Sequence, residues 1–181
     1  MPERPPDRDK VDAVSLVAVC GLPGVGKSTV ARRIAEGIDA EVLRTDVVRK
    51  ELFDDPEYTD AETTAVYDEL LDRAAERLAD GRSVVLDATF KTRERRLEAR
   101  GVADRHDRGF RLVHVDCEER VVERRIEARD GVSDADFEIH RQFREAFEPV
   151  ELDHVAVDNS GSEAETRSQV DAAFRLNTSS P

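Results

Sequence analysis

The chain has 181 residues, which suits one domain with a substantial hydrophobic core. It carries 41 acidic against 28 basic residues and a formal net charge of -13, which argues against a general affinity for nucleic acid or anionic membranes. Its two cysteines are too few for a disulfide framework or a zinc site, and its longest apolar stretch is too short to span a bilayer. We therefore expect a cytoplasmic protein with no membrane contact.

The acidic residues are spread through the predicted helices, as in proteins of salt-loving organisms, although an ordinary acidic cytosolic protein fits equally well. Residues 1–10 are proline-rich and charged, which predicts a disordered arm. We expect one domain over residues 11–176 and a disordered tail over residues 177–181.

The first predicted strand is the apolar run from Val14 to Cys20, and a phosphate-loop motif of the form G-x-x-x-x-G-K-[ST] follows it directly. Its glycines let successive N–H groups point at a polyphosphate, and the helix predicted from there to about Gly37 adds the positive end of its dipole. Lys27 can reach the outer phosphates, and the Ser28 hydroxyl can bind a Mg²⁺ that bridges them. The predicted nucleotide-binding residues are Gly21, Leu22, Pro23, Gly24, Val25, Gly26, Lys27, Ser28 and Thr29.

The second predicted strand runs from Glu41 to Thr45 and ends where Asp46 begins a helix. Arg49 lies one helical turn later, so a carboxylate and a guanidinium would face the same ligand. Asp46 could accept a proton from an attacking hydroxyl, and Arg49 could hold the acceptor. An aspartate at a helix start is, equally, a common N-cap.

A long amphipathic helix is predicted from Thr59 to Asp80, followed by a third strand from Ser83 to Leu86. Asp87 closes this strand, where a carboxylate would meet the Mg²⁺ or its water shell beside the phosphate loop. The alternative is a cap on the next turn. Ser28 and Asp87 are thus the predicted metal residues.

The next predicted helix, from Thr92 to about Arg105, is rich in arginine. Most of these arginines are expected on a solvated face, and Lys91 and Arg95 are kept as potential acceptor contacts. The histidines show no ligand spacing, so none is assigned a metal.

A fourth strand is predicted from Phe110 to Val115, with helices near 118–129 and 134–147. Arg125 and Arg129 share a helix face and could close over the nucleotide phosphates as part of a small lid. The alternative is a solvated face that pairs with neighbouring glutamates.

A short fifth strand from His154 to Val157 and a helix from Glu163 to Leu176 complete the pattern. Alternating strands and helices predict an α/β fold with a parallel sheet, helices on both faces, and ligands at the carboxyl ends of the strands.

Five segments together resemble a family of small P-loop kinases, the AAA-type ATPases of the zeta-toxin and polynucleotide-kinase neighbourhood. They are G-L-P-G-V-G-K-S-T at 21–29, T-D-V-V-R at 45–49, L-D-A-T-F-K-T-R-E-R-R at 86–96, R-I-E-A-R at 125–129, and S-D-A-D with Q-F-R-E-A-F-E-P within 133–149. The resemblance implies a P-loop NTP hydrolase fold with five parallel strands and the first strand central. It also implies Asp46 as general base, Arg49 as its acceptor-side partner, and Arg125 with Arg129 as lid arginines.

The expected activity is transfer of the terminal phosphoryl group of ATP, with Mg²⁺, to a hydroxyl of a small molecule. A nucleic-acid 5′-hydroxyl or an aminoacyl-tRNA is the alternative acceptor. A nucleotide-dependent switch or accessory ATPase is the alternative of another class.

Overall fold

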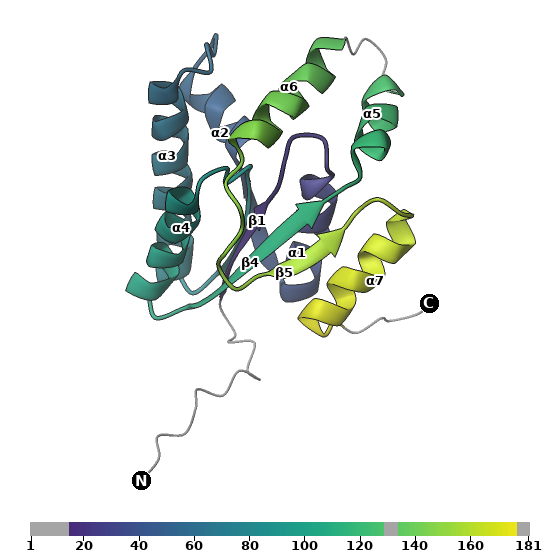
Figure 1. Ribbon diagram of the computed structural model, residues 1–181. Coiled ribbons are helices and arrows are strands. Elements are labelled where there is room, and N and C mark those ends of the chain that lie inside the picture. Colours follow the sequence, from purple (N-terminus) through teal and green to yellow (C-terminus); the bar gives the residue numbers. More distant parts are fainter. Residues whose placement is uncertain (1–14, 129–133, 177–181) are drawn as a thin grey trace.

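The computed structural model describes residues 15–128 and 134–176. Within them, five parallel strands form one sheet in the order β2-β3-β1-β4-β5 (Figure 1). The strands are β1 (Ser15–Cys20), β2 (Ala40–Arg44), β3 (Ser83–Asp87), β4 (Gly109–Asp116) and β5 (Val155–Asp158). The predicted α/β class is therefore confirmed, with β1 at the centre of the sheet.

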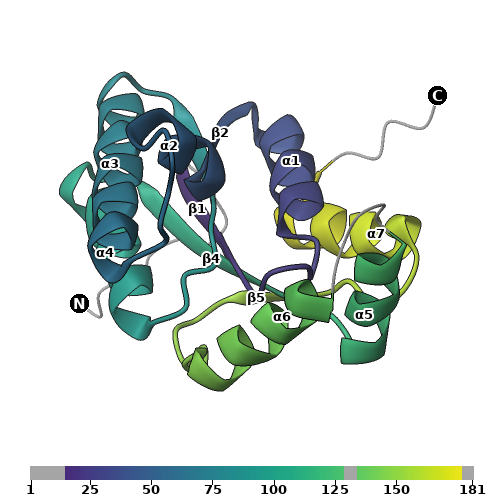
Figure 2. The ribbon, with the colours of Figure 1, turned by 90° about the horizontal axis from the view of Figure 1, so that it is seen from above.

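Helices cover both faces of the sheet (Figure 2). They are α1 (Lys27–Ile38), α2 (Thr45–Leu52), α3 (Asp60–Ala79), α4 (Arg93–Arg105), α5 (Glu119–Glu127), α6 (Asp134–Ala146) and α7 (Glu163–Phe174). One hydrophobic cluster joins the sheet to α3 and α4, and a second joins it to α1, α5 and α7. These two clusters form the core, and they leave the carboxyl ends of the strands for the loops that carry the candidate site residues.

Strand β1 is buried over all six residues, as its continuous apolar run predicts. Its side chains alternate between the two clusters: Leu16 and Ala18 pack toward α3 and α4, whereas Val17 and Val19 pack toward α1 and α7. In the register of the sheet, Val19 lies beside Asp87 of β3, and Arg44 of β2 lies on the other side of Asp87. The polar ends of β2 and β3 are therefore brought to one edge next to the phosphate loop.

The first helix was predicted to end at about Gly37, and α1 ends one residue later, at Ile38. Gly37 is not the residue that terminates it, because the left-handed conformation after the helix belongs to Asp39, with φ of 52°. Gly37 is small for a different reason, because a Cβ there would clash with the side chain of Leu176 near the end of α7. Close packing of two helices, and not a turn, accounts for this glycine.

Helix α6 lies above the sheet, on the side of the strands' carboxyl ends, between α2 and α5 in the view of Figure 1. The segment that joins α5 to α6 falls outside the described residues, so the predicted lid movement stays a prediction. The predicted arm over residues 1–10 and tail over residues 177–181 also lie outside them. Within the described part of the chain, no helix has the length and apolar character needed to cross a membrane.

Candidate active site

The phosphate loop connects β1 to α1 with its glycines in left-handed conformations. Gly24 has φ of 84° and Gly26 has φ of 92°, values that residues with a Cβ rarely adopt. Gly26 is the N-cap residue of α1, no side chain caps this end of the helix, and no acidic residue lies in its first turn. The first N–H groups of α1 are thus left for an anion, and the helix dipole favours the same charge.

Asn159, directly after β5, supports the phosphate loop from behind. Its Nδ2 donates to the carbonyl of Val25 at 2.8 Å, and its Oδ1 accepts from the Thr166 hydroxyl at 2.6 Å. A Cβ at Gly26 would clash with this amide. Sequence reasoning missed Asn159, although its position as a polar residue after a strand at the ligand edge is a signal that could have found it.

Lys27 is held inside the loop, where its Nζ donates to the carbonyl of Leu22 at 2.9 Å. Burial lowers the pKa of Lys27, and the nearby Asp87 carboxylate acts in the opposite direction. The ammonium group therefore lies within the curve of the loop, as the motif predicts. Thr29, in the next position but one, is exposed.

Ser28 and Asp87, the predicted metal residues, are in contact. The Ser28 hydroxyl donates to Oδ2 of Asp87 at 2.6 Å, and Asp87 is 6% exposed. A hydroxyl and a carboxylate are oxygen ligands of the kind that Mg²⁺ prefers, usually together with substrate phosphates. Among the described residues no group of three or more His, Cys, Asp or Glu side chains could hold a metal. The pair therefore fits a magnesium ion that also binds the phosphates of a nucleotide.

Arg44, the last residue of β2, connects Asp87 with Asp46. Its Nε lies 3.6 Å from Oδ2 of Asp87, and its Nη2 lies 2.8 Å from Oδ2 of Asp46. Sequence reasoning missed this arginine, because nothing along the chain shows that its strand pairs with the strand of Asp87. Ser28, Asp87, Arg44 and Asp46 thus form one continuous chain of polar contacts.

Asp46 is the second residue of α2, and the cap position belongs to Arg44. Its Oδ1 accepts from the N–H of the next residue, Val47, at 3.0 Å, and its side chain is 54% exposed. The N-cap alternative is therefore not what the structure shows. The carboxylate is available to a ligand at the carboxyl end of β2.

Arg49 was predicted to face the same ligand as Asp46, but its described contacts are with α3 and the segment before it. It lies 3.5 Å from Glu62 and 3.3 Å from Thr63, and its guanidinium is 4.7 Å from the centre of the Tyr58 ring. Its side chain is only 11% exposed. The structure thus places Arg49 between α2 and α3, where it supports the wall beside Asp46, and a direct role with the acceptor stays a prediction.

Arg125 lies on α5 beside the end of β5. Its Nη2 donates to the carbonyl of Asn159 at 2.8 Å and its Nη1 to the sulfur of Cys117 at 3.5 Å. Helix α5 packs against the phosphate loop, since a Cβ at Gly24 would lie 3.1 Å from Val122. Arg125 is therefore near the loop, though bound to backbone instead of sharing a solvated face with glutamates. Arg129 lies outside the described residues.

The arginines of α4 differ from expectation at one position. Most arginines of this helix were expected on a solvated face. For Arg96 that prediction is wrong, because its side chain is 0% exposed. Arg95 bonds Glu98 at 2.9 Å and Thr64 at 3.0 Å, and the Nζ of Lys91 lies 5.6 Å from the centre of the Phe143 ring. Helical spacing puts Arg96 on the inner face of α4, and its hydrogen bonds to backbone make that burial tolerable.

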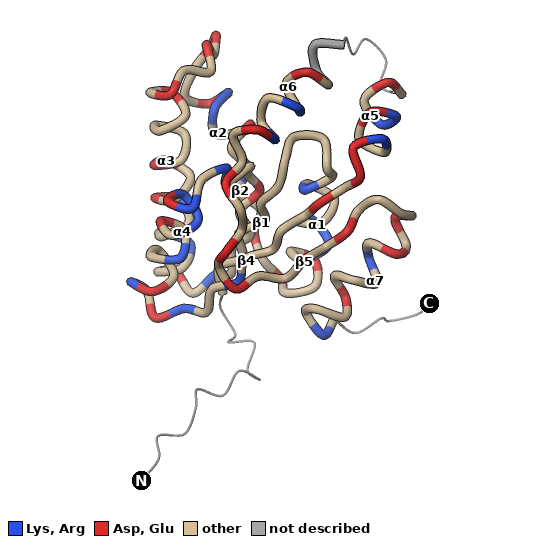
Figure 3. Tube along the Cα trace, in the orientation of Figure 1, with Lys and Arg blue, Asp and Glu red and all other residues tan. Residues whose placement is uncertain are grey.

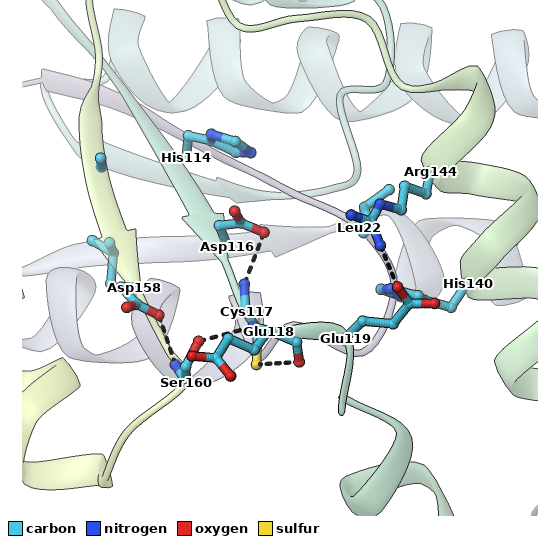
Figure 4. A pocket seen from close by; sticks show the side chains of 12 residues that line it. Leu22, His114, Asp116, Cys117, Glu118, Glu119, His140, Arg144, Asp158 and Ser160 are labelled. Atoms are coloured by element: carbon cyan, nitrogen blue, oxygen red, sulfur yellow. Dashed lines mark hydrogen bonds and ion pairs between the residues drawn. The ribbon is translucent and has the colours of Figure 1, made fainter. Parts of the chain in front are cut away.

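A pocket of about 530 Å³ lies on the other side of β1, between the ends of β4 and β5 and helix α6 (Figure 4). Figure 3 shows acidic segments where β4 and β5 end. Figure 4 shows that polar groups lining the pocket bond to one another: Arg144 pairs with Glu119, and Asp158 accepts from the N–H of Ser160. From α6, Nδ1 of His140 contacts the carbonyl of Pro23 at 2.7 Å. Since a carbonyl only accepts, this nitrogen carries the proton.

The fold and the phosphate loop together define a P-loop α/β domain. A family model described as an AAA domain matches residues 16–150, and the chain therefore belongs to this family. Uncharacterized proteins of Mycobacterium bovis and Mycobacterium tuberculosis are 37% identical over an alignment of 142 residues, and the match covers 70% of this chain. The match spans only 28% of the length of those relatives.

Solved structures of kinases share the fold. A gluconokinase from Sinorhizobium meliloti superposes with a TM-score of 0.71 and 23% identity, over 89% of this chain and 91% of that protein. The Mycobacterium tuberculosis APS kinase, in complex with AMPPNP and APS, superposes with a TM-score of 0.69 and 22% identity, over 90% of this chain and 96% of that protein. The chain thus has the fold of small P-loop kinases, as the resemblance in its motifs implied.

Proposed function

We propose that this protein is a kinase that transfers the terminal phosphoryl group of ATP to a hydroxyl of a small molecule. One observation carries the proposal: Ser28, Asp87, Arg44 and Asp46 follow one another at 2.6, 3.6 and 2.8 Å. This chain of contacts links the phosphate loop to an exposed carboxylate on the neighbouring strand end. A protein that only bound a nucleotide would need the first half of this arrangement and not the second.

The nucleotide would bind along residues Gly21 to Thr29, with the phosphates on the free N–H groups of the loop and of α1. Lys27, inside the loop, would neutralise charge on the transferred group. Ser28 and Asp87 would hold Mg²⁺, which when bound offsets the charge of the outer phosphates. Arg125, beside Asn159, would contact the nucleotide from α5.

Asp46 would accept the proton of the attacking hydroxyl. Its carboxylate is exposed, so an acceptor can reach it, and Arg44 fixes its orientation from one side. Arg49 would brace this side of the site through its contacts with α3. Positioning and charge stabilisation account for most of the rate enhancement in phosphoryl transfer, which is why few reactive groups are needed.

The acceptor is assigned to small molecules for two reasons. The net charge of -13 disfavours a long polyanion such as a nucleic acid. The fold is also shared by a gluconokinase and an APS kinase, which supports an acceptor of that size. A nucleic-acid 5′-hydroxyl or an aminoacyl-tRNA is the alternative acceptor.

The test measures ATP consumption with Mg²⁺ against a panel of sugars, sugar acids, nucleosides, small antibiotics, 5′-hydroxyl oligonucleotides and aminoacyl-tRNA. The proposal expects one class of small molecule to raise the rate and to yield a phosphorylated product by mass spectrometry. A rate that no acceptor raises would support the nucleotide-dependent switch instead. A rise with the nucleic acids alone would replace the small-molecule acceptor.

A further inference from the structure

Arg96 is the largest side chain that is fully buried among the described residues, at 0% exposure. No carboxylate among the described side chains pairs with it. Its guanidinium instead donates to four backbone carbonyls. The Nε donates to Phe90 at 2.9 Å, Nη1 to Pro149 at 2.8 Å, and Nη2 to both Lys91 and Glu148 at 3.1 and 2.5 Å.

These carbonyls belong to two segments that lie far apart in the sequence. Phe90 and Lys91 are in the loop after β3, whereas Glu148 and Pro149 follow α6. The segments are also joined directly, since the N–H of Glu148 donates to the carbonyl of Lys91 at 2.9 Å. The Glu148 carboxylate accepts from the N–H of Arg93 at 2.6 Å. Arg96 is thus the centre of a clamp between the loop after β3 and the C-terminal end of α6.

The clamped loop is also in contact with the candidate site. It begins directly after Asp87, and the carbonyl of Thr89 accepts from the N–H of Gly21, the first residue of the phosphate loop, at 3.2 Å. Phe90 has φ of 46°, an unfavourable conformation for a bulky residue. It is held from both sides, since its N–H donates to the Tyr67 hydroxyl at 2.9 Å and its carbonyl accepts from Arg96.

We propose that Arg96 is a positioning residue that sets the loop directly after Asp87 and the helix α6 in one fixed arrangement for phosphoryl transfer. Helix α6 is then held beside the site in two places. The residues that follow α6 bond Arg96, and His140 of α6 contacts Pro23 of the phosphate loop. Five donors in a planar fork suit this task, whereas a lysine has three donors on one nitrogen and cannot span four carbonyls. This inference rests on the proposed kinase function.

The experiment compares wild type with Arg96→Met and Arg96→Lys, using the acceptor found in the panel. Arg96→Met is expected to lower kcat by about 10²-fold, the order that a misplacement of about 1 Å produces, and Arg96→Lys to recover part of that loss. The Kd of ATP should rise by a much smaller factor than kcat falls, because the clamp reaches the phosphate loop only indirectly, through Thr89 and α6, and bonds neither Lys27 nor the first N–H groups of α1. Arg100→Met is the matched control, since Arg100 lies on the exposed face of the same helix.

Amide hydrogen exchange supplies a readout that does not depend on catalysis. In Arg96→Met, exchange should rise in residues 88–92 and at the C-terminal end of α6, whereas β1 and β3 should keep their protection. Arg96→Met leaves buried carbonyls without a donor and can unfold the protein, so Pro149→Gly serves as a second variant. It keeps the carbonyl that Arg96 contacts but frees the backbone, so it should lower kcat in the same direction by a smaller factor.

Three results would overturn the inference: an unchanged kcat with looser segments, an equal loss of kcat and ATP affinity, or unchanged hydrogen exchange in both variants. The first would make Arg96 merely structural, and the second would make it a general stabiliser of the fold. A wild-type protein that transfers phosphate to no acceptor would remove the proposed function, and the exchange measurement would still report whether the clamp exists.

Discussion

The two halves of the candidate site are built differently. On the nucleotide side, the phosphate loop is fixed by contacts from distant parts of the chain, at Asn159, Thr89 and His140. On the acceptor side, Asp46 is exposed and its described hydrogen bonds come from its near neighbours Arg44 and Val47. A polyphosphate is the same in every ATP-dependent reaction, so its cradle can be rigid, whereas the acceptor differs and its site needs exposed, adjustable groups.

Asp46→Asn should separate the two halves with the largest effect. The amide keeps the shape of the carboxylate but cannot accept the proton, so kcat should fall by about 10²–10⁴-fold. The Kd of ATP should not change, because Asp46 lies on the acceptor side. Steady-state kinetics with isothermal titration of ATP measure both quantities. Asp54→Asn, a change at an exposed position after α2, is the control, and near-normal turnover in Asp46→Asn would remove the base assignment.

Lys27→Met should break the nucleotide half instead. Loss of the ammonium inside the loop should weaken ATP binding and lower kcat by about 10²–10³-fold. Acceptor binding, followed by ligand-observed NMR without ATP, should persist. Lys50→Met changes an exposed lysine of α2 and should match wild type. If Lys27→Met kept both ATP affinity and turnover, the phosphate-loop assignment itself would fail.

Asn159→Ala should show how far the nucleotide half depends on its distant supports. The variant leaves the carbonyl of Val25 without its partner and removes the nearer of the two acceptors of the Thr166 hydroxyl, which should cost about 1–3 kcal/mol in the free energy of unfolding. A loosened loop should also bind ATP about tenfold more weakly, the equivalent of about 1.4 kcal/mol. Urea unfolding and ATP titration measure the two effects.

Gln169→Ala is the matched control for Asn159→Ala. Its amide bonds the backbone of Asp158, the last residue of β5, but it does not reach the phosphate loop. It should lower stability without changing the Kd of ATP. An Asn159→Ala variant that lost stability with full ATP affinity would show that Asn159 supports the fold alone.

The same difference explains what could be predicted from the sequence. The strands, their alternation with helices and the phosphate loop depend on local patterns, and they were confirmed to within a few residues. Asn159, Arg44 and Arg96 act through residues 134, 43 and 52 positions away, at Val25, Asp87 and Glu148. No local pattern records such partners, so a buried arginine of α4 resembles its solvated neighbours until the helix is packed.

The smallest expected effect concerns His114, in the pocket on the far side of β1 from Asp46. Burial lowers the pKa of this imidazole below its usual 6.5, and His154 and Arg96 add to the shift, while Asp116 opposes it. The unfolded chain therefore takes up the proton first as the pH falls, so this group makes the free energy of unfolding decrease on acidification through about 6.5. One proton limits that slope to about 1.4 kcal/mol per pH unit.

His114→Phe should remove this contribution while keeping an aromatic ring against Phe147, whose ring centre lies 5.8 Å from that of His114. Urea unfolding at pH 5.5, 6.5 and 7.5 should show a smaller decrease at acid pH than in wild type. His106→Gln, at the C-terminal end of α4, measures what loss of a histidine outside the pocket does. Turnover at neutral pH should change little in His114→Phe, because the pocket lies apart from the contacts that join Ser28 to Asp46. A large loss of kcat in His114→Phe would instead indicate that the acceptor also binds in the pocket between β4, β5 and α6.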